Sequence, residues 1–285
     1  MDIRLRDADY SHHVLSGGIA HLGNLSFYPL YRQRISLKLS VNVASRLTLM
    51  QLVITMVRIS GVFSGVAFIF FLTLIYQCRA AQDLEVITLS ISNNATIVKA
   101  SATLILPIAP PVLTGALALW SGILLDKDFI QGVSENSPDG LGYCIGLEGN
   151  WCNIPYALTP NVTYGPPVIE APFTRIRTDY IYNPFTSFWD QTIFVNDQLA
   201  TNLSTSPGQR GKTFYIAMEC AGGICPPAPA HRWENMSITL SKPNLLFKHL
   251  GGWSYNATGG QMSTPDGGLT WLFSTLYIPS TPVSP

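Results

Sequence analysis

The sequence predicts an all-β protein, an antiparallel β-sandwich or jelly roll, preceded by an N-terminal hydrophobic helix. Runs rich in Val, Ile, Thr, Phe and Tyr, many alternating apolar with polar residues, are separated by Gly, Pro, Asn or Asp. No amphipathic helix of any length interrupts them, so the connections that a parallel sheet needs are missing. Many short strands at fairly regular spacing therefore favour antiparallel sheets.

The expected strands all follow the hydrophobic segment. The pattern occurs in the runs 83–92, 95–106, 173–182, 191–197, 212–220, 235–241 and 269–278. Two connections have the composition of hairpin turns, because VNDQ (195–198) and TPDGGLT (264–270) place Asn, Asp or Gly where positive φ is required. The sequence contains no evident internal repeat.

The cellular compartment of the protein depends on how the hydrophobic segment 59–78 is interpreted. Residues 59–78 carry no charge and are flanked by arginines, so their length alone could span a hydrocarbon core about 30 Å thick. The basic start at Met56, the apolar run 62–76 and the small residues at Cys78 and Ala80 favour a signal peptide that is cleaved after Ala80. A retained single-pass anchor is the alternative.

Three regions follow from this reading. Residues 1–55 are a leader or cytoplasmic tail, disordered and without assigned chemistry; 56–80 are the signal peptide or signal anchor; 81–285 form a single β-sandwich domain. The expected location is the secretory pathway or the cell exterior, with a single-pass membrane protein as the alternative. Contact with a membrane is expected only through the N-terminal hydrophobic segment, if it is not cleaved.

The region after Ala80 has the features of a secreted glycoprotein. It contains five N-x-[ST] sequons, at Asn94, Asn161, Asn202, Asn235 and Asn256. It also contains four cysteines, and short loops favour the pairs Cys144–Cys152 and Cys220–Cys225. A zinc site is disfavoured because the cysteine spacings are not those of zinc ligands, so no metal is expected.

Charge argues against a nucleic-acid partner. The whole chain balances 17 basic against 17 acidic residues, but from Ala81 onward there are 9 Lys and Arg against 14 Asp and Glu. A domain with this net negative charge has no electrostatic basis for binding phosphate backbones.

Candidate site residues come from strand alternation. In KTFYIAMEC (212–220), three apolar residues should face the core, whereas Tyr215 and Glu219 should face solvent or a binding surface. In HRWENMSITL (231–240), His231, Trp233 and Asn235 share a parity. A glycan on Asn235 would lie in water, which would place Trp233 and His231 near a mouth of the sandwich.

Other residues have the composition of a pocket wall, which combines flat apolar surface with neutral hydrogen-bonding groups. They are Trp120, Gln131, Tyr180, Tyr182, Trp189 and Gln191. Core aromatic residues would look the same in sequence. The chain contains no G-x-S-x-G motif, no H-E-x-x-H motif and no phosphate-binding loop.

Several of these segments together resemble a known family. WSGILL (120–125), FIQGVS (129–134), the first cysteine pair, FWDQTIFVNDQLATNLSTSPGQ (188–209), FYIAMECAGGIC (214–225) and AHRWENMSITLS (230–241) occur in this order. The order resembles that of the fungal hetero-Diels-Alderases of tropolone sesquiterpenoid biosynthesis. The similarity covers roughly residues 112–279, and the first 55 residues depart from the family.

The resemblance implies a lectin-like, concanavalin A-like β-sandwich glycoprotein of the secretory pathway that needs no cofactor. Its substrates would be small molecules, an o-quinone-methide tropolone of polyketide origin and a humulene-type terpene. We expect aromatic walls to hold both partners and neutral donors to bind the tropolone carbonyl. The candidate donors are Gln131, Gln191, Tyr215 and His231, and the candidate wall residues are Trp120, Tyr182, Trp189 and Trp233.

Two other classes of function fit the same residues. In a secreted, lectin-like carbohydrate-binding module, the aromatic residues would stack on sugars, and Asp190 or Glu219 would bind hydroxyls. A lectin-like glycosidase or an acid peptidase would instead pair Glu219 with a Gln or a second acid, for which Asp179 and Asp190 are the candidates.

Overall fold

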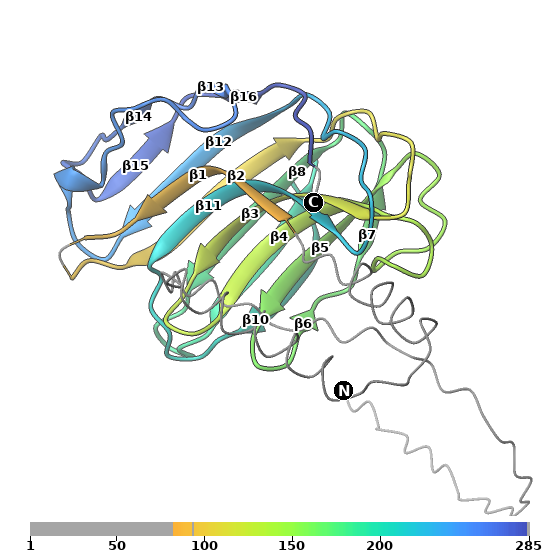
Figure 1. Cartoon of the computed structure of the whole chain (residues 1–285). Coiled ribbons are helices and arrows are strands. Elements are labelled where there is room, and N and C mark those ends of the chain that lie inside the picture. The colour runs from red at the N-terminus through yellow and green to blue at the C-terminus, as the bar shows by residue number, and fades with distance from the viewer. Residues whose placement is uncertain (1–81, 93, 284–285) are drawn as a thin grey trace, which may run out of the picture. The chain divides into compact units, whose positions relative to one another are not determined.

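The computed structural model describes residues 82–92 and 94–283, which fold almost entirely as antiparallel strands (Figure 1). Within these residues the only helical element is a 3-10 turn, η1 (Leu245–Phe247). The all-β prediction is confirmed, and the arrangement of two antiparallel sheets is that of a β-sandwich. The predicted leader, signal segment and N-terminal hydrophobic helix lie outside the described residues.

The first sheet has seven strands in the order β1-β11-β3-β4-β5-β6, and β7 also pairs with β5. In Figure 1, β11, β3, β4 and β5 run side by side across the middle of the view. The strands are β1 (Gln82–Ser90), β3 (Ala116–Leu124), β4 (Phe129–Asn136), β5 (Trp151–Leu158), β6 (Thr163–Tyr164), β7 (Val168–Glu170) and β11 (Thr213–Ala221).

The second sheet has nine strands, seven of them in the order β10-β9-β8-β2-β12-β15-β14, while β16 pairs with β12 and β13. The strands are β2 (Ile97–Ile105), β8 (Arg175–Tyr182), β9 (Trp189–Val195), β10 (Gln198–Thr205), β12 (His231–Leu240), β13 (Thr258–Gly259), β14 (Met262–Ser263), β15 (Thr270–Phe273) and β16 (Leu276–Ile278).

One hydrophobic core fills the space between the sheets. The predicted inward residues of β11, Phe214, Ile216 and Met218, are fully buried in it. Large side chains from both sheets complete the core, among them Trp151 of the first sheet and Trp271 of the second. Alternate residues of each strand therefore point into the sandwich, and the others form the two outer faces.

A buried hydroxyl group links the two sheets at their centre. Tyr180 of β8 donates a hydrogen bond to the carbonyl of Ser121 (2.7 Å) and accepts one from the backbone N–H of Gly132 (2.6 Å). The Ser121 hydroxyl lies 2.9 Å from the same oxygen. Ser121 and Gly132 face each other across β3 and β4. Burial raises the pKa of Tyr180 above its usual value, so the hydroxyl keeps the proton that it donates.

Both predicted hairpin turns are confirmed. Asn196 and Asp197 connect β9 to β10 with φ of 49° and 67°, the two positive values that a type I′ turn requires. Gly267 and Gly268, with φ of 70° and 97°, lie between β14 and β15. The predicted run 269–278 splits into two short strands, β15 and β16.

Both predicted disulfides are confirmed: Cys144 of the preceding loop is bonded to Cys152 of β5, and Cys220 of β11 is bonded to Cys225 of the following loop. The asparagines of all five sequons are exposed, as glycan attachment would require. Paired cysteines are typical of an oxidising, secretory environment. Among the described residues, no helix has the length and hydropathy needed to cross a membrane.

We predict that Tyr180→Phe destabilises the fold by about 1–3 kcal/mol, because it leaves a buried carbonyl and a buried N–H without their partner. Urea unfolding of the purified protein measures the change. Tyr182→Phe is the matched control, because among the described residues no hydrogen bond to the Tyr182 hydroxyl is present. Equal effects of the two substitutions would contradict a role for the Tyr180 hydroxyl.

Candidate functional site

The outer face of the seven-stranded sheet carries a continuous row of aromatic and polar side chains. The row contains one residue from each of six neighbouring strands. Each of these residues faces the next one across the strand pair that they share. They are Tyr164, Tyr156, Gln131, Gly122, Tyr215 and Thr88. We term these residues the aromatic row. With neighbouring strands about 4.8 Å apart, the row extends for roughly 24 Å.

Three aromatic rings pack together where the row crosses β3. Trp120 meets Phe129 edge to face at 5.3 Å between ring centroids, and Phe129 meets Tyr215 in the same way at 5.5 Å. Gly122 makes room for this group, because a Cβ atom there would lie 3.0 Å from the Phe129 ring. These rings form a cluster of their own, separate from the core between the sheets.

Trp120 lies at the bottom of this cluster and holds an unused donor. Its side chain is only 2% exposed, and its indole N–H has no hydrogen-bond partner. Gln131, 4% exposed, lies on the neighbouring strand β4, two residues from Val133, which faces Trp120. Within residues 82–92 and 94–283, no side-chain hydrogen bond to the Gln131 amide is present. Phe129 and Tyr215 are partly exposed and form the accessible wall above them.

A row of carboxylates crosses the same face further along the strands. Asp83 of β1 faces Glu219 of β11, and Glu135 lies on β4, beyond Ala118 of β3. Although Asp83 is exposed, desolvation by the surrounding protein and repulsion from the Glu85 carboxylate raise its pKa to about 6. Facing residues of an antiparallel pair have Cβ atoms about 5 Å apart, so the side chains of Asp83 and Glu219 begin close together on this face.

Glu135 fastens the loop that follows β4. Its Oε1 accepts hydrogen bonds from the backbone N–H of Tyr143 (2.7 Å) and from the Ser137 hydroxyl (3.2 Å). A glycine is needed at position 142, because a Cβ atom there would overlap with the side chains of both Glu135 and Ser137. Burial raises the pKa of Glu135 although these two hydrogen bonds act in the opposite direction.

The fastened loop places Tyr143 over the β5 end of the aromatic row. The Tyr143 ring lies 5.6 Å from that of Tyr156 and 4.7 Å from that of Tyr164. Cys144, the next residue, is tied to β5 by its disulfide. Burial and the hydrogen bond to Tyr156 raise the pKa of Tyr143, so its hydroxyl stays protonated.

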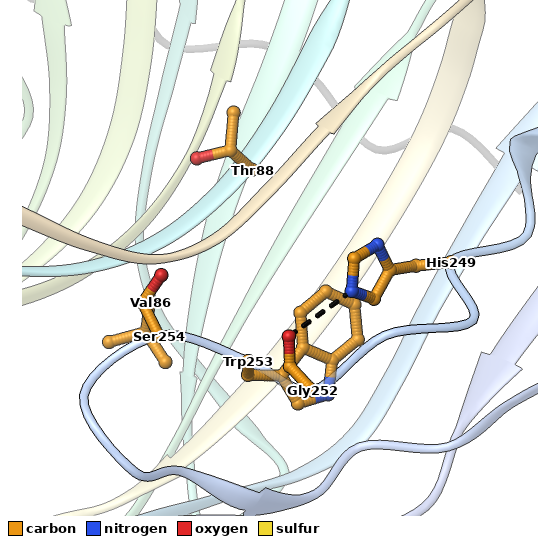
Figure 2. Close-up of a pocket in the computed structure, with 6 residues that line it drawn as sticks. All are labelled: Val86, Thr88, His249, Gly252, Trp253 and Ser254. Carbon is orange, nitrogen blue, oxygen red and sulfur yellow. Dashed lines mark hydrogen bonds between the residues drawn. The ribbon is translucent and has the colours of Figure 1, made fainter.

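A small pocket lies at the other end of the aromatic row, at the edge strand β1. It is lined by Val86, Thr88, His249, Gly252, Trp253 and Ser254 (Figure 2). The imidazole of His249 stacks on the indole of Trp253 at 4.4 Å. Its Nε2 lies 3.3 Å from the carbonyl of Gly252, so this nitrogen carries a proton. The Ser254 N–H donates to the carbonyl of Val86, at a bulge in β1.

The structure brings together three of the eight predicted site residues. Trp120, Gln131 and Tyr215 lie on the outer face of the first sheet. The others, together with Tyr180, belong to the interior of the sandwich or to its margin. They are Gln191, His231, Tyr182, Trp189 and Trp233.

A β-bulge explains why Trp233 is not near a mouth. The register between β12 and β2 shifts between Glu234 and Ser237, and Asn235 has φ of 50°. The bulge breaks the alternation, so Asn235 is exposed while Trp233 is buried. The parity argument that placed Trp233 and His231 at the rim was therefore wrong.

His231 is a buried, neutral side chain. Its Nδ1 donates to the carbonyl of Pro229 (2.8 Å), and its Nε2 has no partner. Desolvation lowers its pKa to about 4, which opposes protonation at neutral pH. Gln191 is also fully buried, and its amide nitrogen lies 3.5 Å from the Thr205 hydroxyl. Both residues belong to the interior that joins the sheets.

The proposed second carboxylates for a hydrolase were also misplaced. Asp179 and Asp190 point from β8 and β9 to the outer face of the nine-stranded sheet, where they meet Ser101 and Ser204. Glu219 lies on the outer face of the other sheet, so the sandwich separates it from both. The acid that faces Glu219 is Asp83, which the sequence analysis did not single out.

The sequence analysis also missed Phe129, Tyr143, Tyr156 and Tyr164. Phe129 and Tyr156 lie on strands that are buried on both faces, where alternation is hidden. The spacing of FIQGVSE was a usable signal, because it puts Phe129, Gln131, Val133 and Glu135 on one face. Among the described residues, no group of three or more His, Cys, Asp or Glu side chains could hold a metal ion.

Comparisons with known proteins give only distant structural neighbours. No family model matches the chain, and no curated protein matches it. The structure of scytalido-glutamic peptidase with a peptide-based transition state analog is 14% identical, covers 68% of this chain and 98% of that chain, and has a TM-score of 0.43. SCP-B, a member of the eqolisin family of peptidases in complex with the tripeptide Ala-Ile-His, is 14% identical, with the same coverage and a TM-score of 0.42. Similarity at this level transfers neither activity nor site residues to this chain.

We predict that Glu135→Gln stabilises the protein at pH 7, by on the order of 1 kcal/mol, and has no such effect below about pH 4. The glutamine oxygen can still accept both hydrogen bonds, but it carries no buried charge. Because the pKa of Glu135 is raised in the folded state, the wild-type protein loses stability as pH rises above the unfolded-state pKa.

Urea midpoints at the two pH values measure this effect, with the exposed Glu148→Gln as the control. A loss of stability at pH 7 for Glu135→Gln would show that the ionised carboxylate itself holds the loop.

Proposed function

We propose that the protein is a cofactor-independent hetero-Diels-Alderase that acts on the outer face of the seven-stranded sheet. The observation that carries the proposal is the partly exposed aromatic wall of Phe129 and Tyr215, packed over Trp120, beside the neutral amide of Gln131 on the same face of the sheet. Flat apolar walls with neutral donors suit a planar, carbonyl-containing substrate. The family resemblance of the sequence supports the same reading, including its finer concanavalin A-like description of the sandwich.

The reaction would begin with a hydroxymethyl tropolone that loses water to give an o-quinone methide. The methide carbon then bonds to one alkene carbon of a humulene-type terpene, and the carbonyl oxygen bonds to the other. No atom leaves in this second step, and no electron acceptor is needed. Negative charge grows on the carbonyl oxygen as the bonds form, so a hydrogen bond to that oxygen lowers the barrier.

The residues divide this work between positioning and polarisation. Phe129 and Tyr215 would hold the two apolar partners in contact, where proximity alone can lower a barrier by several kcal/mol, about 7 at the favourable end. Gln131 and the hydroxyl of Tyr215 would supply the donors, and Trp120 would support the wall from below. Because these residues stand on central strands of the sheet, their geometry is set by backbone pairing and not by mobile loops.

A second candidate function is acid hydrolysis at the carboxylate row. The observation in its favour is the pair Asp83 and Glu219, in which a pKa of about 6 suits Asp83 to act as a general acid near neutral pH. We place it second because the aromatic row would then serve only to bind a substrate. A carbohydrate-binding module is the third reading, in which the same rings stack on sugars.

Product formation tests the first proposal. The purified protein is incubated with a hydroxymethyl tropolone and a humulene alcohol, and the enantiomeric ratio of the adduct is compared with that of a protein-free control. We expect faster formation and one dominant enantiomer. A racemic product at the uncatalysed rate would reject the proposal, and cleavage of peptide or glycoside substrates would favour hydrolysis.

We predict that Phe129→Ala lowers the rate by at least about tenfold and loosens the enantiomeric ratio, because one wall of the site is lost. Glu219→Gln should retain most activity, whereas a hydrolase that lost a catalytic acid would fall by about 10²- to 10⁴-fold. Phe185→Ala, at a fully exposed phenylalanine, is the matched control. Trp233→Ala is unsuitable, because Trp233 belongs to the core.

A further inference from the structure

The segment 241–250, between β12 and β13, displays three leucines to solvent. Leu245, Leu246 and Leu250 are 65%, 76% and 84% exposed. Single exposed apolar residues are common on protein surfaces, but three within six residues form a local apolar tip. We term residues 241–250 the leucine loop.

The leucine loop is held firmly to the sandwich. Phe247 is buried and packs against Trp271 at 6.3 Å between ring centroids. Asn244 caps η1 by accepting from the N–H of Leu246, and its amide donates to the carbonyl of Ser92 (3.1 Å). Because the turn points Phe247 into the core, the two preceding leucines point into solvent. They are exposed although the backbone that carries them is held in place.

The charge around the leucine loop differs from that of the rest of the domain. Two lysines, Lys242 and Lys248, are exposed in the loop, which contains no acidic residue. Five of the nine described cations form ion pairs, and the four without one are Lys99, Lys127, Lys242 and Lys248. Half of the unpaired cations therefore stand beside the exposed leucines, in a domain with excess negative charge.

Two acids lie near the leucine loop. Glu85 accepts a hydrogen bond from the hydroxyl of Thr88 (2.7 Å), which lines the same pocket as His249. Asp266 lies on the hairpin that supports the loop. Gly268 of this hairpin accepts a hydrogen bond from the N–H of Asn244. The carboxylate of Asp266 accepts from the N–H of Thr270 (2.7 Å) and from the Thr264 hydroxyl (3.1 Å). These bonds within its own turn engage the carboxylate, and the two lysines have no ion pair with it among the described contacts.

We propose that the leucine loop docks on a phospholipid surface, with the leucines among the acyl chains and both lysines at the level of the phosphates. Exposed leucines flanked by lysines are typical of interfacial membrane contacts, because lysine stems reach back to the headgroups. The core of a protein interface is instead enriched in aromatic residues, Met and Arg, and depleted in Lys. The composition therefore favours lipid over a protein partner.

This docking does not depend on the proposed catalytic function. It would bring the pocket of His249 and Trp253 to the membrane surface, because His249 directly precedes Leu250 (Figure 2). It also differs from anchoring by the N-terminal hydrophobic segment, because it uses the folded domain itself.

A fluorophore at the loop tests the proposal with the full chain recovered from a secretory host. An environment-sensitive dye is attached at Leu246→Cys, and at Leu199→Cys as the matched control on β10, where the leucine is 63% exposed. Wild-type protein treated with the same dye corrects for labelling at other cysteines. Vesicles of phosphatidylcholine alone and with phosphatidylserine are then added.

We expect a blue shift at position 246 and none at 199, with stronger binding to the vesicles that contain phosphatidylserine. Leu245→Ser with Leu250→Ser should weaken the binding reported at 246 by at least about tenfold. Lys242→Gln with Lys248→Gln should remove the preference for phosphatidylserine. The local dye makes the result independent of the N-terminal segment, which could hold every variant at the membrane.

Three outcomes would overturn the proposal. No shift at position 246 would show that the loop stays in water. Equal shifts at 246 and 199 would show unspecific adsorption. A shift at 246 that depends on protein concentration without vesicles would identify the leucine loop as a contact between copies of the chain.

Discussion

The hydroxyl of Tyr180 is the constraint on which the arrangement of the two sheets depends. It comes from β8 of one sheet and reaches the facing residues Ser121 and Gly132 of the other, with its single proton and both acceptor positions in use. Hydrophobic packing alone does not fix one register between sheets, since apolar contacts are not directional. A buried hydroxyl with three partners does, because any sliding would leave polar groups unpaired. Gly132 matters for the same reason: a Cβ atom there would overlap with Thr178 of β8.

This contact lies directly beneath the candidate site. Gln131 and Gly122, the central members of the aromatic row, are the chain neighbours of Gly132 and Ser121. The inner face at this point is fixed by Tyr180, and the outer face carries Trp120, Phe129 and Tyr215. Strands buried on both faces cannot move without disturbing both clusters. The site is therefore rigid because of its place in the sandwich, whereas its two ends are built from loops: that of Tyr143, held by Glu135 and a disulfide, and that of His249 and Trp253.

The sequence predicted the strands well where one face of the strand is exposed to solvent, and poorly where both faces are buried. Alternation located β1, β2, β8, β9 and β11, and turn chemistry located the hairpin at Asn196 and Asp197. β3, β4 and β5 were missed as strands, because residues on both of their faces are buried and the period of two disappears. The two disulfide pairings were predictable because cysteines that are close in sequence close short loops and pair readily. Trp233 was misplaced because a bulge at Asn235 changes the parity of β12, and no residue pattern in the strand announces it.

The same reasoning explains why the candidate site was only partly predictable. Trp120, Gln131 and Tyr215 come from β3, β4 and β11, which are separated in sequence and become neighbours only through the order β11-β3-β4. Composition can select aromatic and amide residues, but it cannot tell an inner face from an outer one when both are apolar. Trp189 and Trp233 pass the same compositional test, yet they fill the core. What separates the two groups is the direction of each side chain relative to Tyr180. Once that residue identifies the inner face, Ser121 and Gly132 point toward it, and Trp120 and Gln131 must point away.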